Sequence, residues 1–426
     1  MLELFIDNFE KSSNKTKYAF SRFLKKEALK EAEASWKRQK EGNRLSEFDG
    51  IPIGWKDVID LKNFPALAGS KLLKKIRINK AVKDATVVLR AKKKGIISLA
   101  KTSTVEFAFG GLGINTSSFY PPNLMTKGNR CPGGSSSGAA SSVYSNLIPL
   151  AVGTDTAGSI RIPSAWHSLV GFKPTYGRIP IDGILSLARS YDTLGIVAKC
   201  VKDSQILYNI LTEGSYNFAR TKTKKITVCI VDDFITDSLK PKEIAVYESL
   251  IFLLASKGIK IKRIKLPEFN IINDILKEKG GIVNYEAWHY WKKIIKDNFD
   301  SIDKNVAARF ITGKNMPYVE VEKIKEKINF LKNSVHNKFD KSEILMMPTL
   351  AIKPPKIEEV LKNKKYIYYN NLVLNNTRVA NIFNLCVITM PIKKNYWFSF
   401  SLLAKAKEDK RILCVAKEIE DVIKNN

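Results

Sequence analysis

Two glycine-rich segments hold the hydroxyl side chains with the clearest potential for chemistry. They are residues 131–138 (CPGGSSSG) and residues 153–159 (GTDTAGS). An enzyme that transfers acyl groups needs a nucleophile, a base that takes its proton, and backbone N–H donors aimed at the developing oxyanion. Ser159 follows a short turn that contains glycine, where the backbone can approach a substrate closely. This setting favours Ser159 as a nucleophile.

The base is harder to choose from residue types alone. His167 lies a few residues after Ser159, but no acidic residue at a recognisable position would orient it, so we interpret it as structural. A lysine can act instead where burial disfavours the ammonium and lowers its pKa. Lys56 lies in an apolar segment that contains Pro52 and Gly54. On residue types alone, Lys56 is a candidate chosen from many lysines.

Loops rich in glycine and serine also serve other purposes. Some are flexible linkers, and others bind phosphate. A Walker-type phosphate loop requires the pattern Gly-x-x-x-x-Gly-Lys-Ser/Thr. Gly133 and Gly138 have this spacing, but Ala139 and Ala140 follow in place of the lysine and the hydroxyl residue. The sequence therefore excludes a loop of this type.

Alternating helices and strands must position these segments. The apolar residues from Phe20 to Trp36 recur at every fourth position, which predicts a helix over residues 18–40. Asp84 is an N-cap candidate for a helix that ends at Gly95. Such alternation predicts an α/β sheet protein. The further expected elements are strands at 96–99, 147–152, 226–231, 259–264, 345–349 and 387–391, a helix at 242–258, a mainly helical region at 270–338, and a possible boundary at 221–225.

The chain is strongly basic, which raises the question of nucleic-acid binding. It has 426 residues, with 71 Lys+Arg against 42 Asp+Glu, and a formal net charge of +29. Only 14 of the basic residues are arginines, and scattered lysines mostly form a solvated surface. The sequence contains no zinc-ligand pattern and no aromatic-rich RNA motif. A basic nucleic-acid-binding protein without catalysis is therefore a minor alternative, and direct nucleic-acid binding is not expected.

The cysteines and the N-terminal residues indicate the compartment. No two cysteines form a Cys-x-x-Cys pair, so we expect no disulfide framework, no metal site and no cofactor. Residues 1–10 lack the layout of a signal peptide, and no apolar run is long enough to span a membrane. We expect a cytoplasmic protein without a membrane partner. The five cysteines are Cys131, Cys200, Cys229, Cys386 and Cys414.

Taken together, the motifs resemble the amidase signature family. The resemblance is strong over about residues 50–200 and looser as far as Met390-Pro391. It implies one large α/β domain over residues 1–426, with a central mixed sheet covered by helices and a helical variable region at about 270–338. The matching segments are 133–136 (GGSS), 153–161 (GTDTAGSIR), 50–57 (GIPIGWKD), 101–102 (KT), 106–108 (EFA) and 171–178 (GFKPTYGR).

The resemblance implies a Ser–cis-Ser–Lys triad that acts without a cofactor or metal. Ser159 falls on the nucleophile that forms the acyl-enzyme. Ser135 falls on the bridging serine, whose preceding peptide bond is cis in the family, and Lys56 falls on the base. Ser137 stands where the family usually has glycine, and it either narrows the pocket or hydrogen-bonds locally. The implied oxyanion hole consists of the backbone N–H groups of Thr156, Ala157, Gly158 and Ser159.

Two kinds of family member fit the length of the chain. Residues 181–193 (IDGILSLARSYDT) and 384–387 (NLCV) resemble stand-alone amidases that release ammonia or an amine from a small amide. The alternative is the A subunit of glutamyl-tRNA(Gln) amidotransferase, which releases ammonia from glutamine and works beside partner subunits. We favour a general amidase. The sequence names neither the amide nor the oligomeric state.

Overall fold

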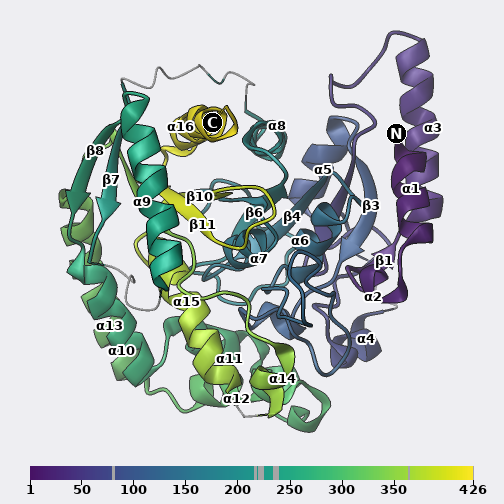
Figure 1. Cartoon of the computed structure of the whole chain (residues 1–426). Helices are drawn as coiled ribbons and strands as arrows, with labels where there is room; N and C mark the ends of the chain where they lie inside the picture. The colour runs from purple at the N-terminus through teal and green to yellow at the C-terminus, as the bar shows by residue number, and fades with distance from the viewer. Residues whose placement is uncertain (79–81, 215–217, 219–224, 234–238, 363–364, 426) are drawn as a thin grey trace.

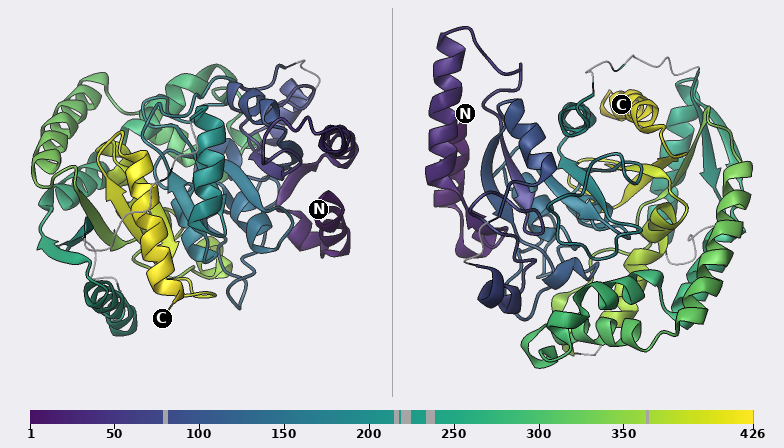
Figure 2. Two further views of the ribbon diagram at one scale, coloured as in Figure 1. Left: turned by 90° about the horizontal axis from the view of Figure 1, so that it is seen from above. Right: turned by 180° about the vertical axis from the view of Figure 1, so that it is seen from behind.

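The structure is a computed structural model that describes residues 1–78, 82–214, 218, 225–233, 239–362 and 365–425. Within these residues, eleven strands form one mixed sheet in the order β1-β3-β2-β4-β6-β5-β10-β11-β9-β7-β8. Figures 1 and 2 show helices packed around this sheet, with α1 and α3 at one end and α10 and α13 near the other. The expected α/β fold with a mixed central sheet covered by helices is confirmed.

The elements have the following bounds. The strands are β1 Phe20–Phe23, β2 Pro52–Lys56, β3 Ile97–Thr102, β4 Leu150–Asp155, β5 Val170–Lys173, β6 Thr193–Ala198, β7 Thr227–Val231, β8 Lys260–Ile264, β9 Glu343–Pro348, β10 Cys386–Pro391 and β11 Ser399–Ala404. The helices are α1 Leu2–Lys11, α2 Asn14–Lys17, α3 Lys25–Lys40, α4 Lys71–Arg77, α5 Thr86–Lys93, α6 Ser137–Tyr144, α7 Arg161–Trp166, α8 Val201–Thr212, α9 Pro241–Ser256, α10 Pro267–Lys279, α11 Ile282–Ile295, α12 Lys304–Lys314, α13 Tyr318–Asn337, α14 Ile357–Lys362, α15 Tyr366–Ile382 and α16 Asp409–Lys424.

The predicted helix over residues 18–40 is wrong in its first part. Phe20–Phe23 is a strand that pairs antiparallel with β3, and helix α3 begins at Lys25. An aromatic segment that can complete a sheet edge gains more from strand pairing than from one more helical turn. Trp36, expected in the core, is 55% exposed and lies under the Lys40 ammonium, with Nζ 3.9 Å from the ring centroid.

The prediction that Asp84 is the N-cap of helix α5 is also wrong. Ala85 occupies the N-cap of α5, and the Asp84 carboxylate accepts the Lys62 N–H at 2.8 Å instead.

The six predicted strands overlap β3, β4, β7, β8, β9 and β10. The possible boundary at 221–225 lies, apart from Lys225, outside the described residues. No helix in the described part of the chain combines the length and apolar character that crossing a membrane requires.

Strands β2 and β4 bring the two motif segments together. They are parallel neighbours, with Trp55 paired to Val152, so their carboxyl ends lie at the same edge of the sheet. Every residue of both strands is buried. Gly54 is required here because a Cβ at this position would lie 2.5 Å from Ile148 Cδ1. The pairing places Lys56, the last residue of β2, beside the end of β4.

Candidate active site

Lys56 lies at the centre of a buried polar cluster. Its side-chain Nζ donates to Ser135 Oγ at 2.7 Å and to Thr154 Oγ1 at 2.7 Å, and the residue is fully buried. Burial lowers the pKa of Lys56 to about 7, although the charges of Asp192 and Asp155 oppose the shift. A lysine with this pKa is partly neutral near pH 7, and a neutral amine can accept a proton.

The loop that carries Ser135 is fixed by backbone hydrogen bonds. The peptide bond between Gly134 and Ser135 is cis. Gly134 N–H donates to the Gly111 carbonyl at 2.8 Å, and the Ser135 carbonyl accepts the Val105 N–H at 3.2 Å. A Cβ on Gly134 would lie 2.8 Å from Gly113 Cα, so these two backbone segments pack without side chains between them. The Ser135 hydroxyl is thereby held against Lys56.

Ser159 lies on the neighbouring loop. Its carbonyl accepts the Ser136 N–H at 3.2 Å, and Ser136 Oγ donates to the Thr154 carbonyl at 3.2 Å. Ser159 is buried, with 6% of its surface exposed. Among the described residues, no hydrogen bond joins the hydroxyls of Ser135 and Ser159. The structure therefore places Lys56 and Ser135 in direct contact and brings Ser159 next to them through the backbone of Ser136.

The backbone N–H groups before Ser159 have different partners. Gly158 N–H donates to Asp155 Oδ1 at 2.8 Å. Gly158 has a φ of +126°, and a side chain there would collide with Thr377. The N–H groups of Thr156, Ala157 and Ser159 donate to no acceptor in the part of the chain that the structure describes. Of the four N–H groups expected to bind an oxyanion, these three are therefore free and the Gly158 N–H is engaged.

A buried ion pair between Arg161 and Asp155 fixes the loop that carries Ser159. Arg161 donates to both carboxylate oxygens of Asp155, with Nε–Oδ2 at 3.0 Å and Nη2–Oδ1 at 2.8 Å. Burial by itself raises the pKa of Asp155, but the charge and hydrogen bonds of Arg161, the Lys173 charge and the Asn381 hydrogen bond together lower it to about 2. Helix α15 adds Asn381, whose amide donates to Asp155 Oδ1, and Thr377, whose hydroxyl donates to the Ala157 carbonyl at 2.6 Å.

A second buried carboxylate positions Thr156. The Thr156 hydroxyl donates to Asp192 Oδ1 at 2.6 Å, and Asp192 Oδ2 accepts the Ser186 hydroxyl at 2.6 Å and the Leu187 N–H at 2.9 Å. Burial raises the pKa of Asp192 in spite of these hydrogen bonds. The side chain of Thr156 therefore points at Asp192, and its backbone is fixed beside Ala157.

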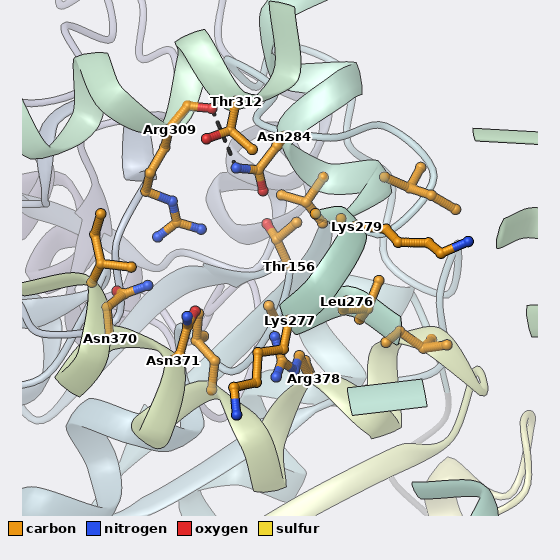
Figure 3. A pocket seen from close by; sticks show the side chains of 18 of the residues that line it. Thr156, Leu276, Lys277, Lys279, Asn284, Arg309, Thr312, Asn370, Asn371 and Arg378 are labelled. Atoms are coloured by element: carbon orange, nitrogen blue, oxygen red, sulfur yellow. Dashed lines mark hydrogen bonds between the residues drawn. The ribbon is translucent and has the colours of Figure 1, made fainter. Parts of the chain in front are cut away.

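A cavity of about 360 Å³ opens at Thr156 and Ala157. Its other walls come mainly from α10, α11, α12 and α15, together with Tyr191 and with Ile328 of α13, and Figure 3 shows many of these side chains. Part of the region expected to be variable, residues 270–338, thus lines this cavity. Ser137 does not line it, and the Ser137 hydroxyl is buried without a hydrogen-bond partner among the described residues. Ser137 therefore does neither of the things expected of it.

His167 lies outside this cluster. It is fully buried, and its Nδ1 lies 2.9 Å from the Pro163 carbonyl oxygen. Burial lowers the pKa of His167 to about 4, and it does not line the cavity. The structural interpretation of His167 agrees with this environment.

Comparison with known proteins identifies the family. The sequence profile of the family described as Amidase matches residues 1–413. The chain belongs to the amidase family. This amidase is accordingly an enzyme that hydrolyses amide C–N bonds. The resemblance seen in the sequence motifs is confirmed.

The relatives of this amidase differ in what they act on. It is 29% identical over 395 residues to 2-amino-5-chloromuconic acid deaminase of Comamonas testosteroni, a match covering 90% of this chain and 84% of that protein. It is 28% identical over 448 residues to the A subunit of glutamyl-tRNA(Gln) amidotransferase from Campylobacter hominis, covering 95% and 96%. A solved amidase structure has a TM-score of 0.87 at 22% identity, over 99% of this chain and 95% of that chain.

Several residues of the site were not predicted to have a role. Asp155, Arg161 and Thr154 lie inside the motif itself, where a charged pair within a segment of small residues was the available signal. Thr377 and Asn381 come from α15, more than two hundred residues away. No local pattern in the sequence marks these two, because only the fold brings α15 to the loop of Ser159.

Proposed function

We propose that this amidase cleaves a carboxamide C–N bond through Ser159, Ser135 and Lys56, with an acyl-enzyme intermediate. The observation that supports this most directly is the 2.7 Å hydrogen bond between Lys56 Nζ and Ser135 Oγ in a fully buried setting. The pKa of about 7 gives Lys56 a neutral fraction at neutral pH. Residues 1–426 are proposed to form one amidase domain, which agrees with the single sheet.

The proposed reaction begins with attack of Ser159 Oγ on the amide carbonyl carbon. The Ser159 proton passes to Ser135 Oγ as the Ser135 proton passes to Lys56 Nζ. The C–N bond then breaks, and the proton returns by the same route to the leaving nitrogen, which departs as ammonia or an amine. Water repeats the sequence on the ester, forms the free acid and restores Ser159.

The free N–H groups of Thr156, Ala157 and Ser159 are the proposed oxyanion donors. Gly158 contributes differently, since its N–H holds Asp155 and its lack of a side chain leaves room for Thr377. Rigid donors aimed at the developing negative charge are usually the largest single contribution to acyl transfer.

The proposal is tested by Ser159→Ala. We expect this variant to lose hydrolysis of a panel of amides and to lose covalent labelling by a fluorophosphonate probe. Ser249→Ala is the matched control, because Ser249 is exposed on α9 and bonds only within its own helix. Labelling and turnover of Ser159→Ala at the wild-type level would overturn the assignment.

The A subunit of a glutamyl-tRNA(Gln) amidotransferase is the second candidate. Similarity to such subunits at 27–32% identity supports it, at about the same level as the similarity to the deaminase. Purification from the native cell distinguishes the two functions. Partner subunits that co-purify, together with glutamine hydrolysis that depends on them, would favour the second candidate. Turnover of small amides by the isolated chain would favour the stand-alone amidase.

A further inference from the structure

Two arginines line the cavity, and neither forms an ion pair with a described residue. Arg309 on α12 has its Nη1 buried and without a hydrogen bond in the described part of the chain. Arg378 on α15 donates to two neutral amides, Asn273 at 2.5 Å and Asn375 at 2.6 Å. Figure 3 shows the Arg309 side chain projecting into the cavity toward Asn371 and Thr156.

The charge of these arginines is poorly compensated. Burial lowers the pKa of Arg309 to about 10. Burial and the nearby Arg309 charge lower the pKa of Arg378 to about 10, although the Asp274 charge opposes this shift. Both guanidiniums therefore remain cationic at neutral pH. Both residues are half-buried, and a charge that is partly withdrawn from water without a partner is costly.

The remaining charges of the cavity wall do not neutralise this pair. Lys277 and Lys279 add positive charge, although Lys279 is paired with Glu320 at 2.7 Å. Glu278 is the one carboxylate among the described lining residues, and it is exposed and forms no ion pair. The cavity is therefore cationic on the side formed by α12 and α15.

The guanidinium of Arg309 is also held in place. Its Cζ lies 4.2 Å from the centroid of the Phe109 ring, so one face of the guanidinium is stacked. Stacking leaves the N–H edge available, and this edge matches the two oxygens of a carboxylate. The same cavity reaches Thr156 and Ala157, beside which the scissile amide is expected to lie.

We propose that the cavity selects amides whose acyl part carries a carboxylate, and that the Arg309 guanidinium binds this carboxylate. The inference rests on the proposed function for the position of the amide end. Arg378 contributes favourable charge from the second wall. A volume of about 360 Å³ suits a small ligand of this kind.

The test compares binding and turnover in the same variants. Arg309→Met removes the charge and keeps the length of the side chain, whereas Arg309→Lys keeps the charge. Arg263→Met is the control, because Arg263 on β8 is paired with Asp232 and Glu248 and does not line the cavity. Removal of an unpaired charge should not lower the Tm of Arg309→Met, so loss of folding is not expected to obscure the result.

Binding is measured by calorimetry with succinate, glutarate and adipate, using wild type and Ser159→Ala. We expect at least one diacid to bind both proteins alike. Arg309→Met should weaken that binding by about 10- to 100-fold, as expected for a charge-assisted hydrogen bond. Arg309→Lys should weaken it less. Failure of all three diacids to bind, or equal binding by Arg309→Met, would overturn the proposal.

Turnover is measured with glutaramate and pentanamide, which differ in the terminal carboxylate. Wild type should show the higher kcat/KM for glutaramate by about 10- to 100-fold, and Arg309→Met should lose this preference. Arg309-dependent diacid binding without any amide turnover would support the carboxylate site and count against the proposed hydrolysis. Equal turnover of both amides without diacid binding would leave hydrolysis standing and overturn the carboxylate site.

Discussion

Asp155 binds Arg161 through both of its carboxylate oxygens, and the same two oxygens accept the N–H groups of Gly158 and Ile160 at 2.8 and 3.1 Å. The ion pair therefore holds the backbone on both sides of Ser159. Both side chains are almost completely buried, at 0% and 1% exposure. The Asp155 carboxylate thus sets the conformation of the loop that carries Ser159.

Asp155→Asn should lower the free energy of unfolding by about 3 kcal/mol, because it leaves the buried Arg161 charge without its partner. Activity should be lost as well, since the amide cannot accept all five hydrogen bonds that the carboxylate accepts. Urea denaturation and amide turnover measure the two effects. Glu33→Gln is the control, because its exposed pair with Lys37 should contribute less than about 1 kcal/mol. Equal effects of the two variants would contradict the role of Asp155.

The pKa of Lys56 predicts the pH dependence of the reaction. The base must be neutral, so kcat/KM should rise with pH through an apparent pKa near 7 and then level off. Lys56→Ala should lose most of its activity near neutral pH and above. A wild-type pH–rate profile that stays flat between pH 6 and 8 would argue against Lys56 as the base.

The same pKa also predicts how stability depends on pH. Lys56 has a pKa of about 7 in the folded protein and an ordinary value near 10.5 when unfolded. Between these values the unfolded chain binds more protons, so wild-type stability should rise with pH across this window. Lys56→Met should be more stable than wild type at pH 7 while remaining inactive. Lys26→Met, an exposed substitution on α3, is the control.

Thr154→Val should change the pH profile rather than abolish the reaction. Thr154 Oγ1 accepts a hydrogen bond from Lys56 Nζ and thereby favours the ammonium. Its loss should lower the apparent pKa of the pH–rate profile and reduce kcat/KM by about 5- to 10-fold. Thr212→Val, which removes a hydroxyl bonded within α8, is the matched control. A lower rate with an unshifted profile would indicate a purely structural role.

Ser137→Ala should leave kcat/KM within about 2-fold of wild type, because the Ser137 hydroxyl makes no hydrogen bond to a described residue and so holds no part of the site. The free energy of unfolding should rise by about 1 kcal/mol, since the buried hydroxyl has no partner. Ser142→Ala on the same helix removes a hydroxyl that donates to the Gly138 carbonyl at 2.6 Å, and should destabilise instead. A large loss of activity in Ser137→Ala would show that Ser137 shapes the substrate site.

Local pattern was sufficient for much of the fold and for β4, one of the two strands that carry the motif segments. Strand β2, which ends at Lys56, was not predicted. The predicted strand at 147–152 overlaps β4, and the glycine-rich segments lie at its end and beside it. The error at Phe20–Phe23 arose because a helical period is also compatible with an edge strand once β3 is available as a partner. The roles of Lys56 and Ser135 came from a family resemblance, because the apolar segment that contains Pro52 and Gly54 made Lys56 only a candidate among many lysines.

Contacts made by distant segments could not be predicted in the same way. Thr377, Asn381, Arg309 and Arg378 acquire their surroundings only when α12 and α15 pack against the loops at the ends of β2 and β4. Their types are unremarkable in a chain with this much positive charge. For the two arginines, the informative property is partial burial without an ion pair to a described residue, which a sequence does not display.

Helix α15 contacts the loop that carries Ser159 and also lines the cavity. Thr377 and Asn381 hold the loop, while Asn370 and Arg378 line the cavity. Among these contacts, helices α10, α11 and α12 touch only the cavity. We therefore expect substitutions at their cavity-facing positions to change substrate recognition while leaving the loop of Ser159 intact. Substitutions in α15 should act on recognition and on the Ser159 loop together.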